Sequence, residues 1–407
     1  MFSFLAASLV FGLLSFGAVL PHSALLLAII WLIAFAVVAT VSIARKRPGS
    51  EVLLILVTPV LVLPLGPKLA LGLFAGVWAY LATLWQRHNV LRFYRFLVLV
   101  GVLEAFLGLL QYFLVPGWIF NFQNPFYRSS GTLINHNHFA GLLEMLIPVA
   151  LACAYIATER FGDFARSYMS VLAASLMGLA VLFAISRMGI LSAVTTILFL
   201  GFIVRVRHSQ KRLPTGLTLG VIALVLAGAL WIGIDSVVLR YSELTGSEAL
   251  LREGRVLVFA DTIRMIKANP LGIGIGRYQD VFRQYQTYRP ELLFDHTHND
   301  YLETIAEWGL PIAITFWMSL FFLLYRSVRA FFTVSAIEQR GILLGCIGPI
   351  LSILVHSLTD FNLQIPSNAM LFFTFVGIAA ASLFPWDRPI IQRRKGSGQR
   401  EHRLSTA

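Results

Sequence analysis

Residues 24–44 read ALLLAIIWLIAFAVVATVSIA, a run of 21 residues without a single charge. A helix that crosses a membrane needs roughly 20 mostly apolar residues, whereas the strands of a membrane barrel alternate apolar and polar positions. The run shows no such alternation, so it excludes a barrel. Because every backbone polar group must be hydrogen-bonded inside hydrocarbon, the run predicts a transmembrane helix.

The remainder of the 407-residue chain has the same apolar character, with 57% hydrophobic and only 13% charged residues. A soluble domain averages about 25% charged residues, so lipid surrounds most of this chain. The two cysteines, Cys153 and Cys346, lie inside apolar runs and are predicted to be buried packing residues. We predict twelve spans, near residues 2–20, 24–44, 51–64, 67–86, 91–115, 138–158, 168–185, 188–206, 214–235, 307–327, 339–357 and 367–385.

Basic residues cluster after every second predicted span, which sets the expected orientation of the chain. Short cytoplasmic loops carry an excess of Lys and Arg, so these clusters mark the cytoplasmic face and place both termini there. Membrane orientation therefore explains the formal charge of +12 without a nucleic-acid partner. The clusters are Arg45 to Arg47, Arg87 to Arg95, Arg160 and Arg166, Arg205 to Arg212, Arg326 to Arg340, and Arg388 to Arg403.

The expected fold class is all-α: a polytopic integral membrane protein of about 12 transmembrane helices, with a long periplasmic loop that carries short helices. One of these short helices is predicted from Arg255 to Ala268, with an apolar face at Val256, Phe259, Ala260, Ile263 and Ile266. The chain divides into transmembrane helices 1–9 at 1–235, the large loop with the catalytic residues at 236–306, transmembrane helices 10–12 at 307–385, and a basic cytoplasmic tail at 386–407.

Four polar segments interrupt the apolar background, and all four fall on the predicted periplasmic side. They hold five of the nine histidines, which a random scatter would not concentrate on one side. We therefore predict an active site formed by residues 128–141, 186–189, 254–255 with 295–309, and 356–362. The candidate substrate-binding residues are Asn135, His136, Asn137, His138, His296, Asn299, Asp300, His356 and Asp360.

Arg187 lies between two apolar runs with almost no loop around it. A cation beside hydrocarbon is costly unless it reaches the interface, so one interpretation is a side chain that anchors a helix at the headgroups. The other is a clamp for a lipid-linked phosphate, because the planar guanidinium makes two parallel hydrogen bonds to phosphate oxygens. The residue pattern leaves both interpretations open.

The histidines of the long loop fit two kinds of chemistry. His296, His298 and Asp300 alternate in spacing, and alternate residues of an extended segment can point the same way toward a metal ion. No cysteine ligand and no helical pair of histidines accompanies them in the sequence. Because imidazole titrates near neutral pH, a general base needs fewer assumptions, and we expect His298 in that role without a metal.

Two of these segments resemble the O-antigen ligase family, which also contains O-antigen polymerases and protein O-oligosaccharyltransferases of bacteria. Residues 135–141, Asn-His-Asn-His-Phe-Ala-Gly, are similar to the family's segment before its middle spans. Residues 298–302, His-Asn-Asp-Tyr-Leu, followed by Ala-Glu-Trp-Gly-Leu at 306–310, are the most specific match. The twelve-span layout with a long late loop is also similar, and the resemblance is best from about 128 to 370.

The resemblance implies transfer of a glycan from an undecaprenyl pyrophosphate-linked donor to an acceptor hydroxyl, at the periplasmic face of the bacterial inner membrane. Such enzymes act in lipopolysaccharide or exopolysaccharide biosynthesis and use no nucleotide sugar, metal or cofactor. Arg187 and Arg255 would engage the pyrophosphate, and His298 would activate the acceptor, which is a glycan, a lipid A-core or a protein. A Trp often follows the family's loop arginine, whereas Val258 and Phe259 stand there in this chain.

The chemistry of such a donor gives the expected mechanism. Negative charge grows on the pyrophosphate as the glycosidic bond breaks, and arginines at the membrane surface would stabilise it. In-line attack predicts inversion at the anomeric carbon. Asp300 or Asp295 is expected to orient the imidazole, as carboxylates do in hydrolytic triads. The choice among ligase, polymerase and protein glycosylation, the sugar and the oligomeric state stay open.

A transporter for lipid-linked glycans is an alternative of a different class. It would also need cations near phosphate, but it should carry ionisable residues deep inside its spans. Glu104 and Glu144 are the main candidates for such buried acids, and hydrogen bonding between helices would explain them equally well. The chain shows no inverted repeat of the kind that many transporters have, which favours an enzyme.

Overall fold

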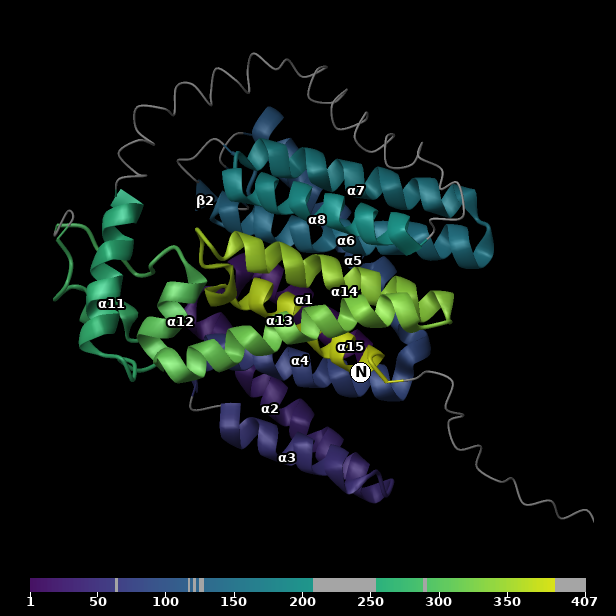
Figure 1. Cartoon of the computed structure of the whole chain (residues 1–407), viewed down its shortest axis with the longest axis horizontal. Helices are drawn as coiled ribbons and strands as arrows, with labels where there is room; N and C mark the ends of the chain where they lie inside the picture. The colour runs from purple at the N-terminus through teal and green to yellow at the C-terminus, as the bar shows by residue number, and fades with distance from the viewer. Residues whose placement is uncertain are drawn as a thin grey trace, which may run out of the picture.

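The computed structural model describes residues 1–62, 65–115, 118–119, 122–123, 128–207, 254–287 and 291–384. Regular structure in these residues is helical apart from one antiparallel pair of short strands, β1 (Trp118–Ile119) and β2 (Phe122–Gln123). Seven of the described helices are long and apolar enough to cross a membrane. The chain is therefore a multi-pass membrane protein of all-α architecture, as the sequence predicts (Figure 1).

The long helices lie where the apolar runs predict them. One continuous segment of membrane length contains both α4 and α5, joined by the 3-10 turn η3 (Arg87–Asn89), and three shorter apolar helices occupy further predicted spans. The predicted span 214–235, the first part of the long loop (236–253) and the tail at 386–407 lie outside the described residues, so the count of twelve stays a prediction. The bounds are α1 Phe2–Leu14, α2 Pro21–Ala44, α3 Gly49–Val62, α4 Pro67–Gln86, α5 Val90–Phe113, α6 His136–Phe161, α7 Phe164–Ala184, α8 Arg187–Arg207, α13 Leu310–Thr333, α14 Ile337–His356 and α15 Pro366–Ser382.

The first predicted span, 2–20, is shorter in the structure than in the prediction. Helix α1 ends at Leu14, and the 3-10 turn η1 (Phe16–Ala18) follows it. Phe16, Gly17 and Ala18 all have positive φ, which no α-helix continues through. The apolar run therefore forms a half-length helix, followed by a bend into α2.

The predicted tenth span, 307–327, is divided at Gly309. Helix α12 (Asp300–Trp308) ends there, and α13 begins at Leu310. Gly309 has φ +80, and a side chain at this position would meet the backbone of Leu271, so glycine alone fits. Helix α12 therefore lies outside the apolar bundle, at the end of α13.

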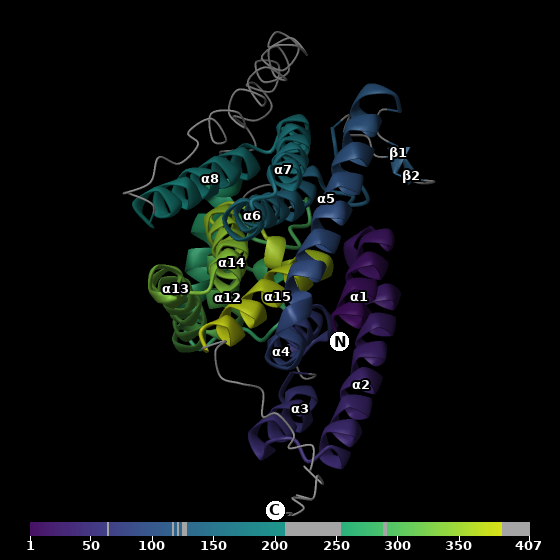
Figure 2. The same cartoon turned by 90° about the vertical axis from the view of Figure 1, so that its right-hand side faces the viewer.

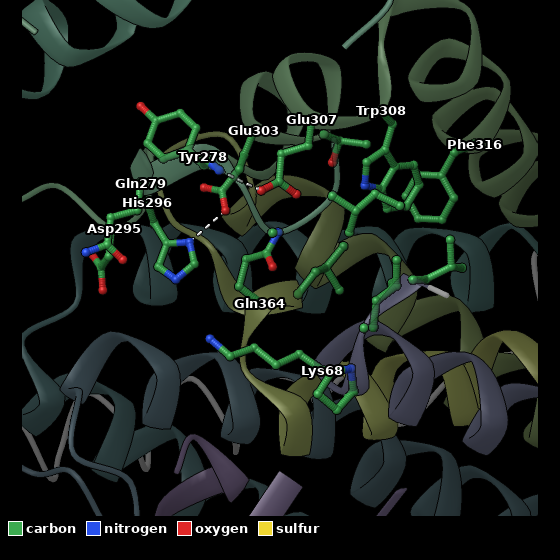
Figure 3. Close-up of a pocket in the computed structure, with 18 of the residues that line it drawn as sticks. Lys68, Tyr278, Gln279, Asp295, His296, Glu303, Glu307, Trp308, Phe316 and Gln364 are labelled. Atoms are coloured by element: carbon green, nitrogen blue, oxygen red, sulfur yellow. Dashed lines mark hydrogen bonds and ion pairs between the residues drawn. The ribbon is translucent and has the colours of Figure 1, made fainter. Parts of the chain in front are cut away.

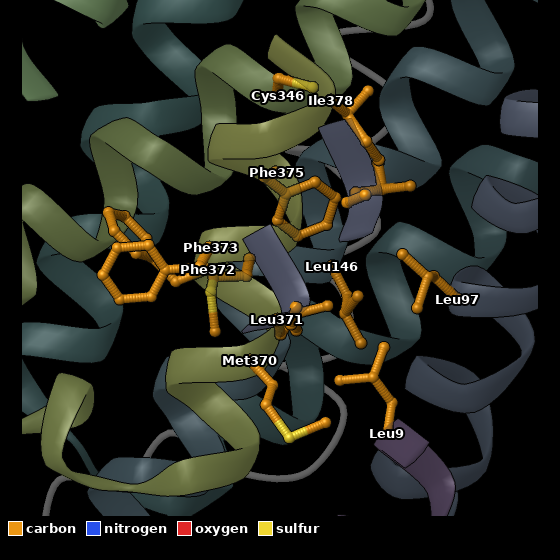
Figure 4. Packing of buried hydrophobic residues seen from close by; sticks show 14 of the residues in the cluster. Leu9, Leu97, Leu146, Cys346, Met370, Leu371, Phe372, Phe373, Phe375 and Ile378 are labelled. Atoms are coloured by element: carbon orange, nitrogen blue, oxygen red, sulfur yellow. The ribbon is translucent and has the colours of Figure 1, made fainter. Parts of the chain in front are cut away.

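Helix α6 is the centre of the bundle, with 94% of its most apolar window buried. It packs against α5, α7, α8 and α14, and Figure 4 shows the apolar contacts around its Leu146. Polar side chains also join helices where lipid surrounds them. The hydroxyl of Ser192 in α8 donates to Ser352 O in α14 (2.6 Å). The hydroxyl of Tyr94 in α5 donates to Ile342 O in α14 (2.9 Å).

The first helices form a peripheral layer that packs through aromatic rings. Trp31 and Phe35 of α2 lie against Phe74 and Trp78 of α4, with ring centroids between 5.2 and 6.4 Å apart. Such offset and edge-to-face pairs are the favoured aromatic geometries. Figure 2 shows α1, α2 and α3 along one side of the molecule, away from α6, α7 and α8. This layer supports α4, whose first residues reach the site described below.

A cap of short helices covers one end of the bundle, at the left of Figure 1. It consists of a helix over residues 254–268, α11 (Tyr278–Phe282) and α12. The predicted helix from Arg255 to Ala268 is confirmed. The cap has a small core of its own, made of Val258, Met265, Ile273, Tyr278, Phe282 and Ala306.

The buried face of the helix 254–268 differs from the predicted one. Val256 is 64% and Ile263 42% exposed, whereas the polar residues Asp261 and Thr262 are buried. The reason is hydrogen bonding to the rest of the cap, because the Asp261 carboxylate accepts from the backbone N–H of Thr287 (2.6 Å). Apolar periodicity alone does not reveal such a polar contact.

Candidate active site

One buried carboxylate, Asp360, lies among three of the predicted polar segments. Three imidazole nitrogens face its two oxygens: Nε2 of His138 at 3.8 Å, Nδ1 of His298 at 3.7 Å and Nε2 of His356 at 3.9 Å. Asp360 itself is only 2% exposed. Segments that are far apart in the sequence thus meet at one carboxylate, as the one-sided clustering of polar residues predicts.

Helix ends position two of these histidines. His138 lies in the first turn of α6, whose start is capped by the side chain of Asn135, which accepts from the backbone N–H of Asn137 (2.8 Å). His356 is the last residue of α14, and Asp360 follows after a turn. Because α6 begins where α14 ends, the two helices bring these side chains to the same level of the bundle.

His298 occupies the turn before α12, where its backbone has φ +56. A residue with a side chain rarely adopts this left-handed conformation, which costs about 1–3 kcal/mol and persists where surrounding contacts impose it. Asn299 supplies such contacts: its side chain accepts from Leu302 N–H (3.0 Å) and donates to Leu358 O (2.8 Å). The turn is thereby tied both to α12 and to the segment after α14.

The side chain of His298 is 28% exposed, although its Nδ1 is buried against Asp360. The exposed edge of the ring is therefore the one that carries Nε2. A general base needs one nitrogen open to the substrate and the other beside a carboxylate that sets the tautomer. Among the three imidazoles around Asp360, His298 has this arrangement, whereas His138 is 5% and His356 0% exposed.

The charge of Asp360 follows from its surroundings. Burial opposes ionisation of the carboxyl group, but the imidazoles of His138 and His298 outweigh burial and hold the pKa of Asp360 well below its usual value. Asp360 is therefore an anion at neutral pH.

The carboxylate that faces His298 is thus Asp360, instead of Asp300 or Asp295 as predicted. Asp300 accepts hydrogen bonds from the hydroxyl of Ser357 (2.7 Å) and from Leu363 N–H (3.3 Å), and it ties α12 to the segment after α14. Burial raises the pKa of Asp300 well above its usual value. The exposed Asp295 lies on a neighbouring cavity. Spacing along the loop does not distinguish these three carboxylates.

His356 has a second partner inside the bundle. Its Nδ1 lies 3.0 Å from both carboxylate oxygens of Glu144 in α6, and neither side chain is exposed. A buried pair of this kind is costly to break, because one charge would lose its partner. The contact holds His356 inside the bundle, and the predicted role of His356 in binding substrate stays a prediction. The predicted substrate-binding residues whose side chains are buried behind His298 are His138, His356, Asp300 and Asp360.

His296 also has a carboxylate partner within the protein. Its Nδ1 lies 2.6 Å from Glu303 Oε1, and Glu303 also accepts from the backbone N–H of Thr297 (2.9 Å). Burial lowers the pKa of His296, but the Glu303 carboxylate outweighs burial, so the pKa is raised above its ordinary value. The pair fixes the extended segment before His298.

The ring of Phe361 packs against three imidazoles. Its centroid lies 4.3 Å from that of His296 in a stacked arrangement, 4.7 Å from that of His138 and 4.8 Å from that of His298. Phe361 is 7% exposed, so the four rings form one packed group. Sequence reasoning misses this residue, and its one signal is its place inside the polar segment that contains Asp360.

Two arginines lie beside the first turn of α6. Arg128 Nη1 is 2.7 Å from Nε2 of His136. Arg255, in the first turn of the helix 254–268, is half-buried and also acts electrostatically on His136. Arg128 begins the first predicted polar segment, but the sequence alone does not mark it as a candidate site residue. Asn135, His136 and Asn137 are half-buried here.

Arg187 is the exposed first residue of α8. In the turn before it, the hydroxyl of Ser186 accepts from Gly189 N–H (3.2 Å). A side chain at Gly189 would meet Cβ of Ala140, so α8 begins against the first turns of α6. The turn therefore places Arg187 at the same end of the bundle as His298.

A cavity of about 410 Å³ adjoins this group of rings (Figure 3). Small-molecule sites commonly have volumes of roughly 300–1,000 Å³. The loop before α12, α12 itself and the first residues of α4 surround it, together with parts of α13 and α15. Its polar lining residues are Lys68, Tyr278, Gln279, Asp295, His296, Glu303, Thr304, Glu307 and Gln364.

Within the described residues, no group of three or more His, Cys, Asp or Glu side chains is arranged to hold a metal ion. The alternating His296, His298 and Asp300 do not converge, because each has a different carboxylate or hydroxyl partner. The arrangement supports acid–base chemistry at His298. That the reaction needs no metal stays a prediction.

These features define a class: a polytopic membrane protein with histidines around a buried carboxylate, and with arginines, at one end of its helices. Residues 172–317 match the family model described as O-antigen ligase. The match runs from α7 to α13 and includes Arg187, Arg255 and His298, and it confirms the resemblance to that family over this segment. The family implies glycan transfer of the O-antigen ligase or polymerase type by a membrane glycosyltransferase. Among curated proteins, none matches this chain.

Proposed function

We propose that this protein transfers a glycan from an undecaprenyl pyrophosphate-linked donor to an acceptor hydroxyl, as a metal-independent, inverting glycosyltransferase. The observation that carries the proposal is the environment of His298, which has one ring nitrogen beside the anion Asp360 and its opposite edge exposed. The match to the O-antigen ligase family over the same residues supports it. Neither feature depends on which sugar is transferred.

In this mechanism His298 is the general base. Its Nε2 takes the proton of the acceptor hydroxyl while that oxygen attacks the anomeric carbon of the donor. The bond between that carbon and the pyrophosphate oxygen breaks, and its electron pair leaves with undecaprenyl pyrophosphate. Asp360 stabilises the resulting imidazolium, as carboxylates do in triads. The imidazolium then returns its proton to solvent.

The leaving group needs cations, because its negative charge increases as the bond breaks. Arg187 and Arg255 take this role, and Arg128 adds a third guanidinium beside α6. The planar fork of an arginine binds two phosphate oxygens at once, which a lysine ammonium does not. Arg187 also begins α8, so the positive end of a helix dipole acts in the same place.

The proposed orientation has the site at the periplasmic face of a bacterial inner membrane, with both termini in the cytoplasm. Basic residues support it, since α8 ends with Arg205 and Arg207 at the end opposite to Arg187. Arg160 at the end of α6 forms an ion pair with Glu338 at the start of α14, also away from the site. An excess of Arg at this opposite end is typical of the cytoplasmic side.

Replacement of the general base tests the proposal. His298→Ala should lower glycan transfer from a lipid-linked donor to background, in purified full-length protein whose folding is checked by its melting temperature. The matched control is His88→Ala, which removes a histidine in η3 at the other end of the molecule. If His298→Ala transfers glycan at the wild-type rate, the proposed function is wrong.

Within the same family, a polymerase and a protein O-oligosaccharyltransferase are the alternatives to a ligase. Glycan gel profiles of a deletion strain distinguish them. Free polymer without attachment would indicate a ligase, and single repeat units without polymer would indicate a polymerase. Loss of glycan from proteins alone would indicate protein glycosylation.

The two buried acids, Glu104 and Glu144, do not favour the transporter alternative, because both have structural partners. Glu104 accepts hydrogen bonds from the hydroxyl (2.7 Å) and the backbone N–H (3.0 Å) of Thr132. Glu144 is held by His356. Both acids therefore join segments of the bundle, which is the structural explanation for polar residues inside membrane proteins.

A further inference from the structure

The cavity of about 410 Å³ has no role in the steps proposed above. Its lining residues include His296 but none of Arg128, Arg187 and Arg255, among the residues that the structure describes. Its lining residue His296 belongs to the packed group of rings, because the ring of Phe361 stacks on His296 with centroids 4.3 Å apart and lies 4.8 Å from that of His298. The cavity is thus close to the general base but separate from the cations proposed to hold the pyrophosphate.

The two ends of the cavity differ in chemistry. Figure 3 shows Trp308 and Phe316 together at one end, where their ring centroids are 5.1 Å apart. At the other end lie Asp295 and His296, and Gln364 reaches into the space between the two ends. Aromatic faces offer an apolar surface, whereas amide and carboxylate groups bind hydroxyls. A ligand with an apolar face and a rim of hydroxyl groups, such as a sugar ring, matches both.

The charges that line the cavity nearly balance. Glu303 is paired with His296 at 2.6 Å, and Lys68 faces the same space as Asp295. Burial and the neighbouring Glu303 raise the pKa of Glu307 to about 7, so that carboxyl group is partly neutral at physiological pH. A polyanion such as pyrophosphate finds little net attraction here. An uncharged polyol meets both donors and acceptors.

We infer that this cavity is the acceptor subsite and that it holds the uncharged, hydroxyl-bearing end of an acceptor glycan. The inference rests on the proposed function and narrows its acceptor to a sugar chain in place of a protein side chain. One sugar ring packs on Trp308, with hydroxyls at Glu307 and Gln364. The next unit passes His296 and places its reacting hydroxyl at His298, while the donor stays on the side of the arginines.

Saturation-transfer NMR on the full chain in lipid nanodiscs tests the binding. The two probes are the core oligosaccharide of the host lipopolysaccharide, deacylated and dephosphorylated, and the free repeat-unit glycan released from the host's lipid carrier by mild acid. We expect at least one of the two probes to bind the wild-type protein. The same probe should bind His298→Ala with the same affinity, because His298 does not line the cavity. Trp308→Ala combined with Glu307→Ala should weaken binding at least about tenfold, because both the stacking face and a hydrogen bond are lost.

The matched control is Trp118→Ala, which removes an exposed tryptophan of β1 and should leave binding unchanged. The inference is overturned if neither uncharged probe binds wild type, or if binding survives the double variant. A stronger signal from the phosphorylated core oligosaccharide than from the dephosphorylated one would also overturn it. Binding of a serine-containing peptide at this cavity would assign it to a protein acceptor instead.

Transfer kinetics give an independent test. Trp308→Ala should raise KM for the acceptor about tenfold and leave KM for the lipid-linked donor unchanged, since only one substrate contacts the cavity. A rise in the donor KM alone would place the donor in the cavity. The proposed function fails differently, because transfer would then persist in His298→Ala while sugar binding to the cavity stays intact.

Discussion

His296 and His298 stand two residues apart and pack on the same phenylalanine, yet the structure gives them different chemistry. His296 has a carboxylate of its own, Glu303, at 2.6 Å. His298 lies 3.7 Å from Asp360, which two further imidazoles also face. The first imidazole fixes the loop segment before His298 and borders the neighbouring cavity, and the second is the more exposed, with 28% of its side chain open against 15% for His296. The comparison teaches that the partner carboxylate, which the alternating spacing does not reveal, distinguishes the two histidines.

The largest expected effect comes from removing the charge of Asp360. Asp360→Asn keeps the shape of the side chain but no longer stabilises an imidazolium at His298, and the equivalent change in a hydrolytic triad costs about 10⁴ in kcat. We expect kcat for glycan transfer to fall by about 10³-fold or more. The matched control is Asp280→Asn, an exposed carboxylate of α11. If Glu303→Gln lowered kcat as much, the distinction between the two histidines would be lost.

The second prediction concerns the buried pair behind the site. Glu144→Gln leaves His356 without its anion, and breaking one partner of a buried pair typically costs about 3–5 kcal/mol of stability. The melting temperature of the purified protein should therefore fall by several degrees. Glu291→Gln, at an exposed position of the loop, is the control. An unchanged melting temperature in Glu144→Gln would mean that the pair contributes no net stability.

The third prediction separates the two interpretations of Arg187. Arg187→Lys keeps the charge but loses the planar fork, so a phosphate clamp predicts a fall in kcat of about 10-fold to 100-fold. An interfacial anchor predicts almost no change, because lysine also reaches the headgroups. Arg205→Lys, at the other end of α8, serves as the control. Wild-type kcat in Arg187→Lys would leave the anchor as the better interpretation.

The smallest expected effect is the pH dependence that Glu307 contributes to stability. Its pKa is raised from 4.5 to about 7, so the folded protein keeps a proton that the unfolded chain has already released. Stability is therefore lost as pH rises from about 4.5 to about 7, because the folded state binds more protons in that range. Glu307→Gln has no such loss. Its melting temperature relative to wild type should rise between about pH 5 and about pH 8, and a constant difference would contradict the raised pKa.

The helices of the bundle could be predicted well because membrane thickness fixes the length of an apolar run. The break at Gly309 also has a readable signal, since Trp308-Gly-Leu-Pro311 combines a glycine after one helix with a proline in the first turn of the next. The bend after Leu14 has a weaker signal in the sequence. Its glycine is flanked by Phe16 and Ala18, which rarely adopt positive φ.

The residues proposed for the chemistry stand out because polar groups are rare in this chain. His298 and Arg187 are visible against the apolar background, and the resemblance to a family adds Arg255. The partners of these residues are not visible. His298 precedes α12 in the cap, whereas Asp360 follows α14 of the bundle. Glu144 and His356 are 212 residues apart in the chain. The packing of α6 against α14 brings Glu144 and His356 together, and the turn before α12 brings His298 to Asp360. Spacing along the chain carries no information about either contact.

The left-handed turn at residue 298 has a consequence for the timing of the reaction. Because Asn299 and Glu303 hold this turn through hydrogen bonds within the protein, the imidazole is in position before any substrate arrives. In the proposed mechanism, the entropy of ordering the base is therefore lost during folding instead of during catalysis.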